Sequence, residues 1–494
     1  MRLDPNTPVV VGVGATSQHV EDPREGSGAL ELMAIALEHA GKDAGSDALL
    51  SAADTIWMPR GFWRESDPGG WLAERFGAAK ARSVIAEIGI LQTSVLGRAA
   101  AELASGRSEV ALIVGGESRD RDSRLERLGA GGVPRSTSTN RGEGTPSEVI
   151  RPAAEIMGRV EIDLGLVAPT VQYALIDNAL RAHEGQAIEA HRAELGRLWA
   201  DFNDVAVDNP RAWDRTKRSA GEIVLPSESN RMLAYPYTKS LVSQWNVNQA
   251  GGLILCTLAK ARRLGLDESR FVYPLAVVDS EHMVTSSERR DLHRAPGFAL
   301  AGRVARDHVG RDIGSIEHLE LYSCFPAAVR VQQRELGVDP KRRVTKTGGM
   351  TFAGGPLNNF VIQAWVEMVE ALRRDPGSQG LVTAVSGLMT KQGVSVFGPE
   401  PSRAFLFESV TERAREAQAR VEVDLGATGR ARVATYTVIC GREGDRRVAL
   451  VFDFDDGRRT LRVVVDDELA EEGMRRELCG READLGSGDS IRWI

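Results

Sequence analysis

The sequence predicts a mixed α/β protein made of two similar halves, a helical insertion and a small all-β C-terminal domain. Three observations support this fold class. The chain has 494 residues, too many for one compact core, so two or three domains are expected. Strand and helix patterns alternate up to residue 408, and the same succession occurs twice. Beyond residue 408 the pattern changes to short strands.

The first half is expected to span residues 1–265. Apolar runs predict strands, and apolar residues at helical spacing predict helices. One predicted helix stops just before Gly106, a residue type typical of a helix C-cap. The elements are expected at residues 8–14 (strand), 28–39 (helix), 54–58 (strand), 95–104 (helix), 110–114 (strand) and 252–256 (strand).

Residues 119–231 are predicted to form an insertion within this half. Residues 119–140 are rich in Arg, Asp, Ser, Thr and Gly, which predicts an exposed loop. Helical spacing follows at residues 153–164, 170–182 and 187–202.

The second half is expected at residues 266–408, where the succession of the first half recurs. Each half would contain a strand, a helix, a strand and then a long helix that leads into a strand ending at glycine, which suggests a gene duplication. The elements are expected at residues 271–278 (strand), 299–309 (helix), 318–322 (strand), 357–373 (helix) and 380–385 (strand).

The extra C-terminal domain is expected at residues 409–494. A charged helix at residues 411–420 would connect it to the rest of the chain, and Asp455-Asp456-Gly457 is typical of a hairpin turn. The predicted strands, at residues 432–438, 448–452 and 460–465, favour a small OB-like barrel. Acidic side chains outnumber basic ones in this domain, so a packing or partner-binding role is favoured over nucleic-acid binding.

The bulk composition excludes several classes of protein. The net charge of −7 does not favour DNA, RNA or anionic lipid as a partner. No apolar run approaches the roughly 18 residues of a membrane span, and the N-terminus has no signal-peptide pattern. The four cysteines are far apart, and the histidines do not cluster, so neither a disulfide framework nor a metal site is expected. We expect a cytoplasmic protein.

Three segments are candidates for chemistry. Residues 12–14 read Gly-Val-Gly after a strand, but Ser17 stands where a dinucleotide-binding motif has its third glycine, so a tight turn is favoured. Residues 347–356 are rich in glycine and precede a helix expected from Leu357; they would either bind an anion or oxyanion or form a tight structural loop. Tyr322 and Cys324 follow a strand, at the edge where α/β folds bind ligands, although Cys324 alone is more typical of a small buried residue.

The order of these segments resembles the thiolase superfamily over residues 8–408. The first strand is similar to the opening thiolase strand, and residues 99–118 are similar to the helix and strand that follow the thiolase nucleophile. The remaining matches are Asn248-Gln249-Ala250-Gly251-Gly252 at N-A-S-G-x, Tyr322-Ser323-Cys324-Phe325 at N-E-A-F or H-D-C-F, Gly354-Gly355-Pro356 at G-H-P, and Val385-Ser386-Gly387 at C-x-G.

This resemblance implies a duplicated thiolase fold of five layers, αβαβα, whose helical loop domain holds coenzyme A (CoA). Residues 409–494 agree with a thiolase-like, acetyl-CoA acetyltransferase-like branch that carries an extra β domain. The catalytic positions depart from the family. Gly89 lies near the acyl-accepting cysteine, Gly355 at the G-H-P histidine and Val385 at the C-x-G cysteine, and no cysteine precedes Cys256. Neither glycine nor valine accepts an acyl group or transfers a proton.

The resemblance implies site residues at the matching positions. Tyr322 and Cys324 are the catalytic candidates, and the residues expected to contact substrate are Asn248, Gly354, Gly355 and Gly387. CoA or an acyl-CoA is expected as ligand or substrate, with no other cofactor, and the C-terminal domain is available to bind a protein partner.

Three functions are open to such a chain. The first is binding of CoA or its thioesters without ordinary thiolase turnover. The second is retro-aldol or other C–C lyase chemistry on a β-hydroxyacyl-CoA, because related aldolase-type members have tyrosine at the position of Tyr322 and work with an OB-fold partner. A phenol, with a pKa near 10, is a poor base unless its surroundings change that value. The third is a non-catalytic scaffold.

Overall fold

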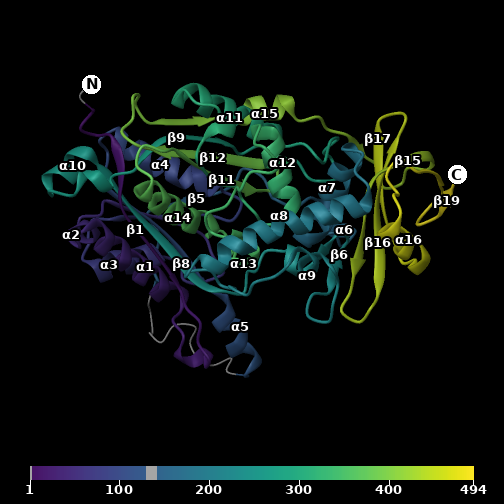
Figure 1. The fold of residues 1–494 in the computed structure, drawn as a ribbon, viewed down its shortest axis with the longest axis horizontal. Helices are drawn as coiled ribbons and strands as arrows, with labels where there is room; N and C mark the ends of the chain where they lie inside the picture. Colours follow the sequence, from purple (N-terminus) through teal and green to yellow (C-terminus); the bar gives the residue numbers. More distant parts are fainter. Residues whose placement is uncertain (1–2, 130–141) are drawn as a thin grey trace.

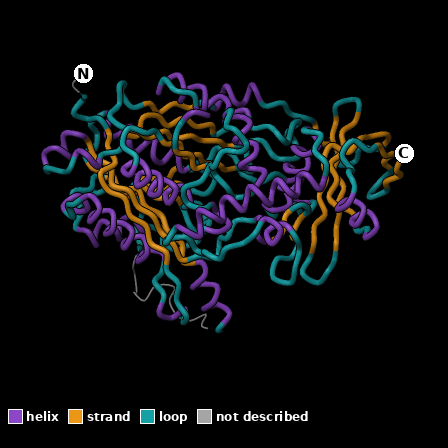
Figure 2. The backbone as a smooth tube through the Cα atoms, in the orientation of Figure 1, coloured by secondary structure: helices purple, strands orange, loops and turns teal. Residues whose placement is uncertain are grey.

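The computed structural model describes residues 3–129 and 142–494 and contains three sheets (Figures 1 and 2). Two of them lie within the first 409 residues, and the third forms the C-terminal end of the molecule, drawn in yellow in Figure 1. The predicted mixed α/β fold with a β-rich C-terminal region is confirmed.

The first sheet has six strands among the described residues. Its order is β1 (Pro8–Ser17), β8 (Asn248–Thr257), β4 (Val110–Ser118), β2 (Thr55–Pro59), β3 (Arg82–Ala86) and β5 (Glu148–Ile150). Strand β8 runs antiparallel to both β1 and β4, whereas β4, β2, β3 and β5 are mutually parallel.

The second sheet repeats this arrangement. Its order is β10 (His318–Glu320), β11 (Gly380–Ser386), β12 (Lys391–Gly398), β9 (Tyr273–Ser280) and β13 (Leu406–Ser409). Strand β12 is antiparallel to β9 and β11, and β11 is parallel to β10. The path β9-β12-β11-β10 therefore has the order and directions of β1-β8-β4-β2, as expected of a repeated unit.

Two helices lie between the sheets. α4 (Gln92–Ala104) and α14 (Phe360–Arg374) each contact strands of both sheets, while α1 (Ala29–Ala44) covers the outer face of the first sheet and α11 (Pro296–Val309) that of the second. Small residues permit the close approach: a Cβ on Gly97 would meet the Phe407 ring at 2.3 Å, and one on Gly115 would meet Asn359 Oδ1 at 1.9 Å.

The prediction of a tight turn at Gly12 and Gly14 was wrong. Both lie inside β1, where a Cβ would meet backbone oxygens of α1 at 2.2 Å (Ala40) and 2.3 Å (Ala36). These glycines let the helix pack directly on the strand.

The insertion is more helical than its composition suggested. Residues 119–127, predicted as loop, form α5 (Arg119–Arg127), and residues 130–141 lie outside the described part of the chain. The helix predicted at residues 153–164 shortens to α6 (Arg159–Asp163). The remaining elements are α7 (Pro169–His183), α8 (Ile188–Asp208), α9 (Ala220–Val224), β6 (Met232–Ala234) and β7 (Tyr237–Thr238).

The glycine-rich segment also differs from its prediction. A short helix, α13 (Gly349–Phe352), lies within it, and α14 begins at Phe360 rather than at Leu357. Helix α12 (Pro326–Leu336) and strands β12 and β13 had no clear signal in the sequence. The other helices are α2 (Ala48–Ser51), α3 (Pro68–Phe76), α10 (Leu258–Arg263), α15 (Thr411–Ala417) and α16 (Asp467–Arg475).

The C-terminal sheet is curled and has its own apolar core. The turn at residues 455–457 joins two antiparallel strands, which confirms the hairpin prediction. The strands are β14 (Glu422–Val423), β15 (Gly429–Cys440), β16 (Arg446–Phe454), β17 (Arg458–Val464), β18 (Glu482–Leu485) and β19 (Ile491–Trp493), and β6 of the insertion pairs with β15.

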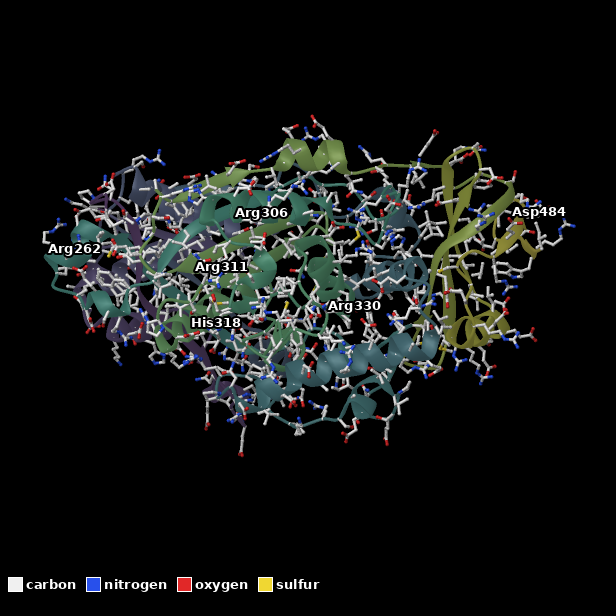
Figure 3. All side chains as sticks on the ribbon, turned by 45° about the horizontal axis from the view of Figure 1, so that its top comes forward. Arg262, Arg306, Arg311, His318, Arg330 and Asp484 are labelled. Atoms are coloured by element: carbon white, nitrogen blue, oxygen red, sulfur yellow. The ribbon has the colours of Figure 1, made fainter. Side chains whose placement is uncertain are left out.

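A buried ion-pair cluster joins the insertion to the second half. Arg330 of α12 lies 2.9 Å from Asp177 of α7, and Arg330 also contacts Glu184 and Glu194. In Figure 3 Arg330 lies between Arg262 and Asp484, which mark opposite ends of the molecule. Within the described ranges, no helix is long and apolar enough to cross a membrane.

Candidate functional site

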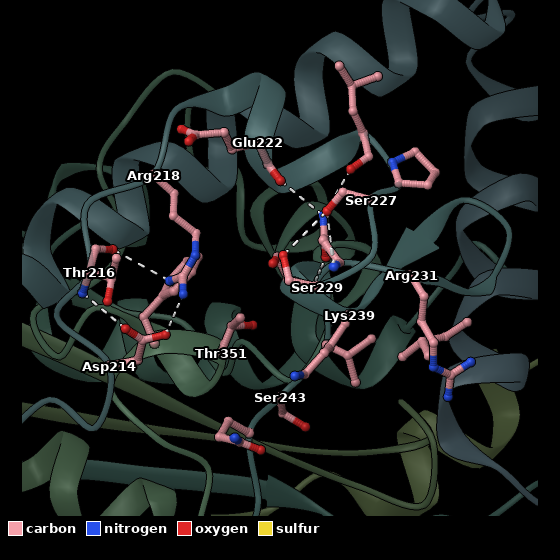
Figure 4. A pocket seen from close by; sticks show the side chains of 18 of the residues that line it. Asp214, Thr216, Arg218, Glu222, Ser227, Ser229, Arg231, Lys239, Ser243 and Thr351 are labelled. Carbon is pink, nitrogen blue, oxygen red and sulfur yellow. Dashed lines mark hydrogen bonds and ion pairs between the residues drawn. The ribbon is translucent and has the colours of Figure 1, made fainter. Parts of the chain in front are cut away.

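A cavity of about 1230 Å³ opens between the helical insertion and α13 (Figure 4). Its walls come mainly from the end of the insertion, with a contribution from α13. The lining includes the basic and aromatic side chains of Trp213, Lys217, Arg218, Arg231, Lys239, Trp245, Phe352 and Arg442, together with Ser243 and Gln244.

Asn230 shapes one wall of this cavity. Its side-chain amide donates to the backbone carbonyls of Glu222 and Leu225, and its Oδ1 accepts from the Ser240 amide at 2.8 Å. These bonds hold the chain after α9 in an open loop. Arg218 bonds Asp214 at 2.7 Å, and in Figure 4 this pair lies across from Ser227 and Ser229.

The cavity carries more basic than acidic side chains. Five lining residues are basic (Lys217, Arg218, Arg231, Lys239 and Arg442), and three are acidic (Asp214, Glu222 and Glu228). Arg231, Lys239 and Arg442 have no carboxylate within ion-pair distance in the described part of the chain. Unpaired cations at a cavity favour an anionic ligand.

The inner end of the cavity adjoins the segments that resemble thiolase motifs. The Ser243 amide donates to the Cys324 carbonyl at 3.2 Å, and the Gln244 amide donates to the Met350 carbonyl at 2.9 Å. The Gly355 amide in turn donates to the Gln244 carbonyl at 2.7 Å. Residues 243–244 therefore bind the backbone of both motif segments, while Tyr322, Cys324 and Gly355 do not line the cavity.

Tyr322 follows β10 and is partly buried. Its amide donates to Thr383 Oγ1 at 2.8 Å, its carbonyl accepts from Gln332, and its ring meets Phe360 edge-on. Two causes raise the pKa of the Tyr322 phenol well above its ordinary value: burial, which has the larger effect, and the nearby Cys324 thiol. The phenol therefore stays protonated, and its chemistry is that of a hydrogen-bond donor available to a ligand rather than that of a base.

Cys324 is buried at 7% exposure. Burial raises the pKa of its thiol to about 12, although a hydrogen bond from Tyr173 opposes this effect. Tyr173 is itself buried, and its ring stacks on Phe325 with centroids 4.4 Å apart. The thiol is therefore neutral at physiological pH and is not an activated nucleophile.

The predicted glycines contact side chains that fill the space beside them. A Cβ on Gly354 would lie 2.2 Å from Gln249 Oε1, and one on Gly355 would lie 3.1 Å from Met350 Cε. Gly387 has φ +56°, and a Cβ there would meet Met283 Sδ at 2.6 Å.

Asn248 lies at the start of β8 and does not line the cavity. Its Oδ1 accepts from the Arg121 amide at 2.9 Å, and its Nδ2 donates to the Gln18 carbonyl at 3.1 Å. These bonds attach β8 to α5 and to the end of β1.

The position expected for the acyl-accepting cysteine has a polar surrounding that the sequence did not indicate. Gly89 has φ +103°, and its carbonyl accepts from Lys391 Nζ at 2.7 Å. Lys391, at 1% exposure, pairs with Glu281 at 3.1 Å. Ser94 donates to Glu281 at 3.0 Å and to Asp279 at 2.6 Å, while burial raises the pKa of Asp279 to about 6.

No local pattern of residues pointed to this cluster, because its members come from both halves. Ser94 belongs to the first half, while Asp279, Glu281 and Lys391 belong to the second. Among the described residues, no group of three or more His, Cys, Asp or Glu side chains has the arrangement of a metal site.

Comparison with known proteins gives structural likeness alone. No family model matches the sequence, and no curated protein matches it. The structure is similar to a monomeric SCP2-thiolase-like protein type 1 from Mycobacterium smegmatis, with a TM-score of 0.82, 26% identity and 100% of both chains covered.

Two further solved structures share part of the fold. The Ltp2-ChsH2(DUF35) aldolase has a TM-score of 0.59 and 18% identity, covering 80% of this chain and 99% of that one. The dimeric peroxisomal thiolase of Saccharomyces cerevisiae has a TM-score of 0.56 and 14% identity, covering 81% and 99%. Together with the repeated strand order, these likenesses confirm the resemblance seen in the sequence: the chain has a thiolase-like fold.

Proposed function

We propose that this protein binds CoA or a CoA thioester and does not carry out ordinary thiolase turnover. The observation that carries the proposal is the 1230 Å³ cavity, whose lining includes five basic side chains and whose inner end adjoins Cys324 and Met350. The solved thiolase and SCP2-thiolase-like relatives make a CoA thioester the first ligand to test.

The chemistry of the cavity suits the parts of CoA. Its phosphate groups would find cations at Arg231 and Lys239, which have no carboxylate partner among the described residues; in Figure 4 Lys239 lies between Arg218 and Arg231. Trp213, which stacks on His19 with centroids 3.9 Å apart, and Trp245 would provide flat surfaces for the adenine ring. The pantetheine arm would then extend toward Ser243 and Gln244.

The proposed loss of thiolase turnover follows from the side chains at the reaction centre. Gly89 has no group to accept an acyl chain, and Gly355 and Val385 have none to move its protons. Cys324 does not replace the missing nucleophile, because its thiol stays neutral and does not line the cavity.

The site residues expected from the sequence have narrower roles in this proposal. Tyr322 and Cys324 do not line the cavity, so they would not contact the thioester directly; the Cys324 carbonyl and the Gly355 amide would support the inner end of the cavity through their bonds to residues 243–244. Gly354 and Gly387 would leave room for the Gln249 and Met283 side chains beside them. Asn248 would hold the start of β8 in place through its bonds to Arg121 and Gln18. The duplicated five-layer core and an OB-like C-terminal domain remain the architecture that we propose for this function.

Calorimetric titration with CoA, acetyl-CoA and acetoacetyl-CoA tests the binding. We expect saturable binding of all three, and we expect acetoacetyl-CoA to remain uncleaved when free CoA is supplied with it. The variant Lys239→Gln should weaken all three ligands, while Lys80→Gln, a change of equal charge outside the cavity lining, should not. A flat titration with every ligand would reject the proposal.

A retro-aldol or C–C lyase reaction on a β-hydroxyacyl-CoA is the second candidate, supported by the partly exposed Tyr322 and by the fold shared with the aldolase. Because burial raises the pKa of Tyr322, the phenol would donate to the thioester oxygen and another group would have to remove the proton. Cleavage by Tyr322→Phe at the wild-type rate would exclude this role.

A non-catalytic scaffold is the third candidate. Its support is the packing of Met350 over Gly355 and of Gln249 over Gly354, which leaves little space at two motif positions. Flat titrations with CoA and with both thioesters would favour the scaffold over the first proposal.

A further inference from the structure

The wall of the cavity includes one residue from the C-terminal sheet. Arg442 lies in the turn that joins β15 to β16, whereas the other lining residues in the described part of the chain come from residues 213–246 and from α13. The side chain of Arg442 is exposed, and in the described part of the chain it has no carboxylate within ion-pair distance. An unpaired guanidinium at the edge of a cavity is free to bind an anion there.

A second arginine lies beside this turn. Arg231 donates from Nη1 to the carbonyl of Cys440, two residues before Arg442, at 3.3 Å. Its guanidinium also lines the cavity and likewise has no carboxylate partner in the described ranges. Two unpaired guanidinium groups, one from the insertion and one from the C-terminal sheet, therefore lie at the same end of the cavity.

The position of the turn is fixed by the way the sheet docks. The Tyr235 amide donates to the Val438 carbonyl at 2.9 Å, which continues the pairing of β6 with β15 close to the turn. Farther along β15, Asn178 of α7 donates to the Tyr436 carbonyl at 2.9 Å. Arg181 of the same helix pairs with Glu477. The base of the turn is thus held against the insertion before any ligand arrives, which lowers the entropy cost of binding.

We propose that the C-terminal sheet completes the ligand site, with Arg442 and Arg231 together binding a phosphate group of the ligand. The inference rests on the proposed binding of CoA, but the recognition chemistry is that of any phosphomonoester or diphosphate. The planar guanidinium forms paired hydrogen bonds with phosphate oxygens, and two of them neutralise a doubly charged group. The C-terminal sheet then has a direct role in ligand binding in addition to its packing role.

Titration calorimetry with CoA and with pantetheine, which lacks phosphate, tests the assignment. Arg442→Gln should bind CoA about tenfold more weakly, the effect of losing one charge-assisted hydrogen bond. Its affinity for pantetheine should not change. The matched control is Arg476→Gln, which removes an exposed arginine from the same domain outside the cavity lining and should leave both affinities unchanged. Because Arg442 is exposed and unpaired, the midpoint of thermal unfolding should not change in its variant.

The outcomes separate this proposal from the proposed function. Equal CoA affinity of the wild type and Arg442→Gln would overturn the role of the C-terminal sheet while leaving CoA binding in place. If the wild type binds no CoA, the proposed function fails, and inorganic pyrophosphate becomes the probe. Pyrophosphate binding that is weakened in Arg442→Gln but not in Arg476→Gln would support the phosphate site. Absence of pyrophosphate binding, or equal binding by both variants, would overturn it.

Discussion

Met350 lies directly over Gly355, with its Cε 3.1 Å and its Cβ 3.2 Å from the point that a Cβ on Gly355 would occupy. Gly355 is the position at which the sequence resembles the G-H-P histidine of thiolases. A histidine there would have to enter space that Met350 fills. The loss of this catalytic side chain and the packing of the neighbouring loop are therefore coupled.

The coupling predicts the result of restoring the histidine. Gly355→His alone should lower the free energy of unfolding by about 1–3 kcal/mol, because the added ring overpacks the loop. Adding Met350→Ala should recover part of that loss. In a double-mutant cycle, the coupling energy between the two positions should be about 0.5 kcal/mol or more. Urea unfolding of the four proteins measures it. Strictly additive losses would show that the two side chains do not compete for space.

Restoring the nucleophile alone should also fail. Gly89 has φ +103°, and a Cβ there would lie 3.2 Å from both Ile156 and Pro152. Gly89→Cys should therefore lower the free energy of unfolding by about 1–3 kcal/mol through backbone strain. It should also show no acetyl adduct by intact-mass spectrometry after exposure to acetyl-CoA.

Gly45→Cys is the control for this substitution, because Gly45 also has positive φ, +71°, but no atom within 4 Å of its added Cβ. It isolates the cost of the backbone conformation from that of crowding. An acetylated Gly89→Cys protein with wild-type stability would contradict this account of the site.

The buried carboxyl of Glu320 should make the stability of the fold depend on pH. Burial raises the pKa of this carboxyl to about 7, although it accepts from the amides of Lys346 and Thr347. Since the unfolded value is about 4.5, the folded state binds the extra proton between pH 4.5 and 7. Stability should therefore fall as pH rises through this window, by up to about 3 kcal/mol from this group.

Glu320→Gln removes the titration and keeps an acceptor for both amides. Its unfolding free energy, followed by urea titration from pH 4.5 to 8, should decline less steeply than that of the wild type. The exposed change Glu422→Gln should leave the slope unaltered. An unchanged slope in Glu320→Gln would assign the pH dependence to another group, such as Glu117, whose pKa burial raises to about 8.

The buried side chain of Arg459 should contribute to the free energy with which the C-terminal sheet docks on the second half. Its buried guanidinium donates to the carbonyls of Ser287 at 3.3 Å and Arg290 at 3.0 Å, and to that of Arg289. Arg459→Gln would leave buried carbonyls unpaired and should cost about 2–4 kcal/mol. Hydrogen exchange should also become faster in residues 287–290.

The matched control for Arg459→Gln is the same substitution at the neighbouring Arg458. Its guanidinium is more than one-third exposed and pairs with Asp456 and Asp424 at the surface, so Arg458→Gln should cost less than about 1 kcal/mol. Similar losses in the two variants would indicate that the buried contacts of Arg459 add little to the docking.

The sequence by itself determined many of the strands and helices, although not α5, α12, β12 or β13, and it determined the absence of the side chains that thiolases use at the matching positions. Apolar runs and helical spacing are local patterns, so β1, α1, α7, α8 and the hairpin at residues 455–457 could be predicted from them. The missing cysteine before Cys256 and the glycine at position 355 are facts of composition that no folding alters.

The tertiary structure alone decided where the cavity forms and which side chains line it. Arg231 and Arg442 are 211 positions apart in the numbering, and the pairing of β6 with β15 brings their backbones together. Gly12 and Gly14 were misread for the same reason: the helix that they accommodate is distant in sequence. Contacts of this kind depend on how whole elements pack, and a local pattern of residue types does not encode them.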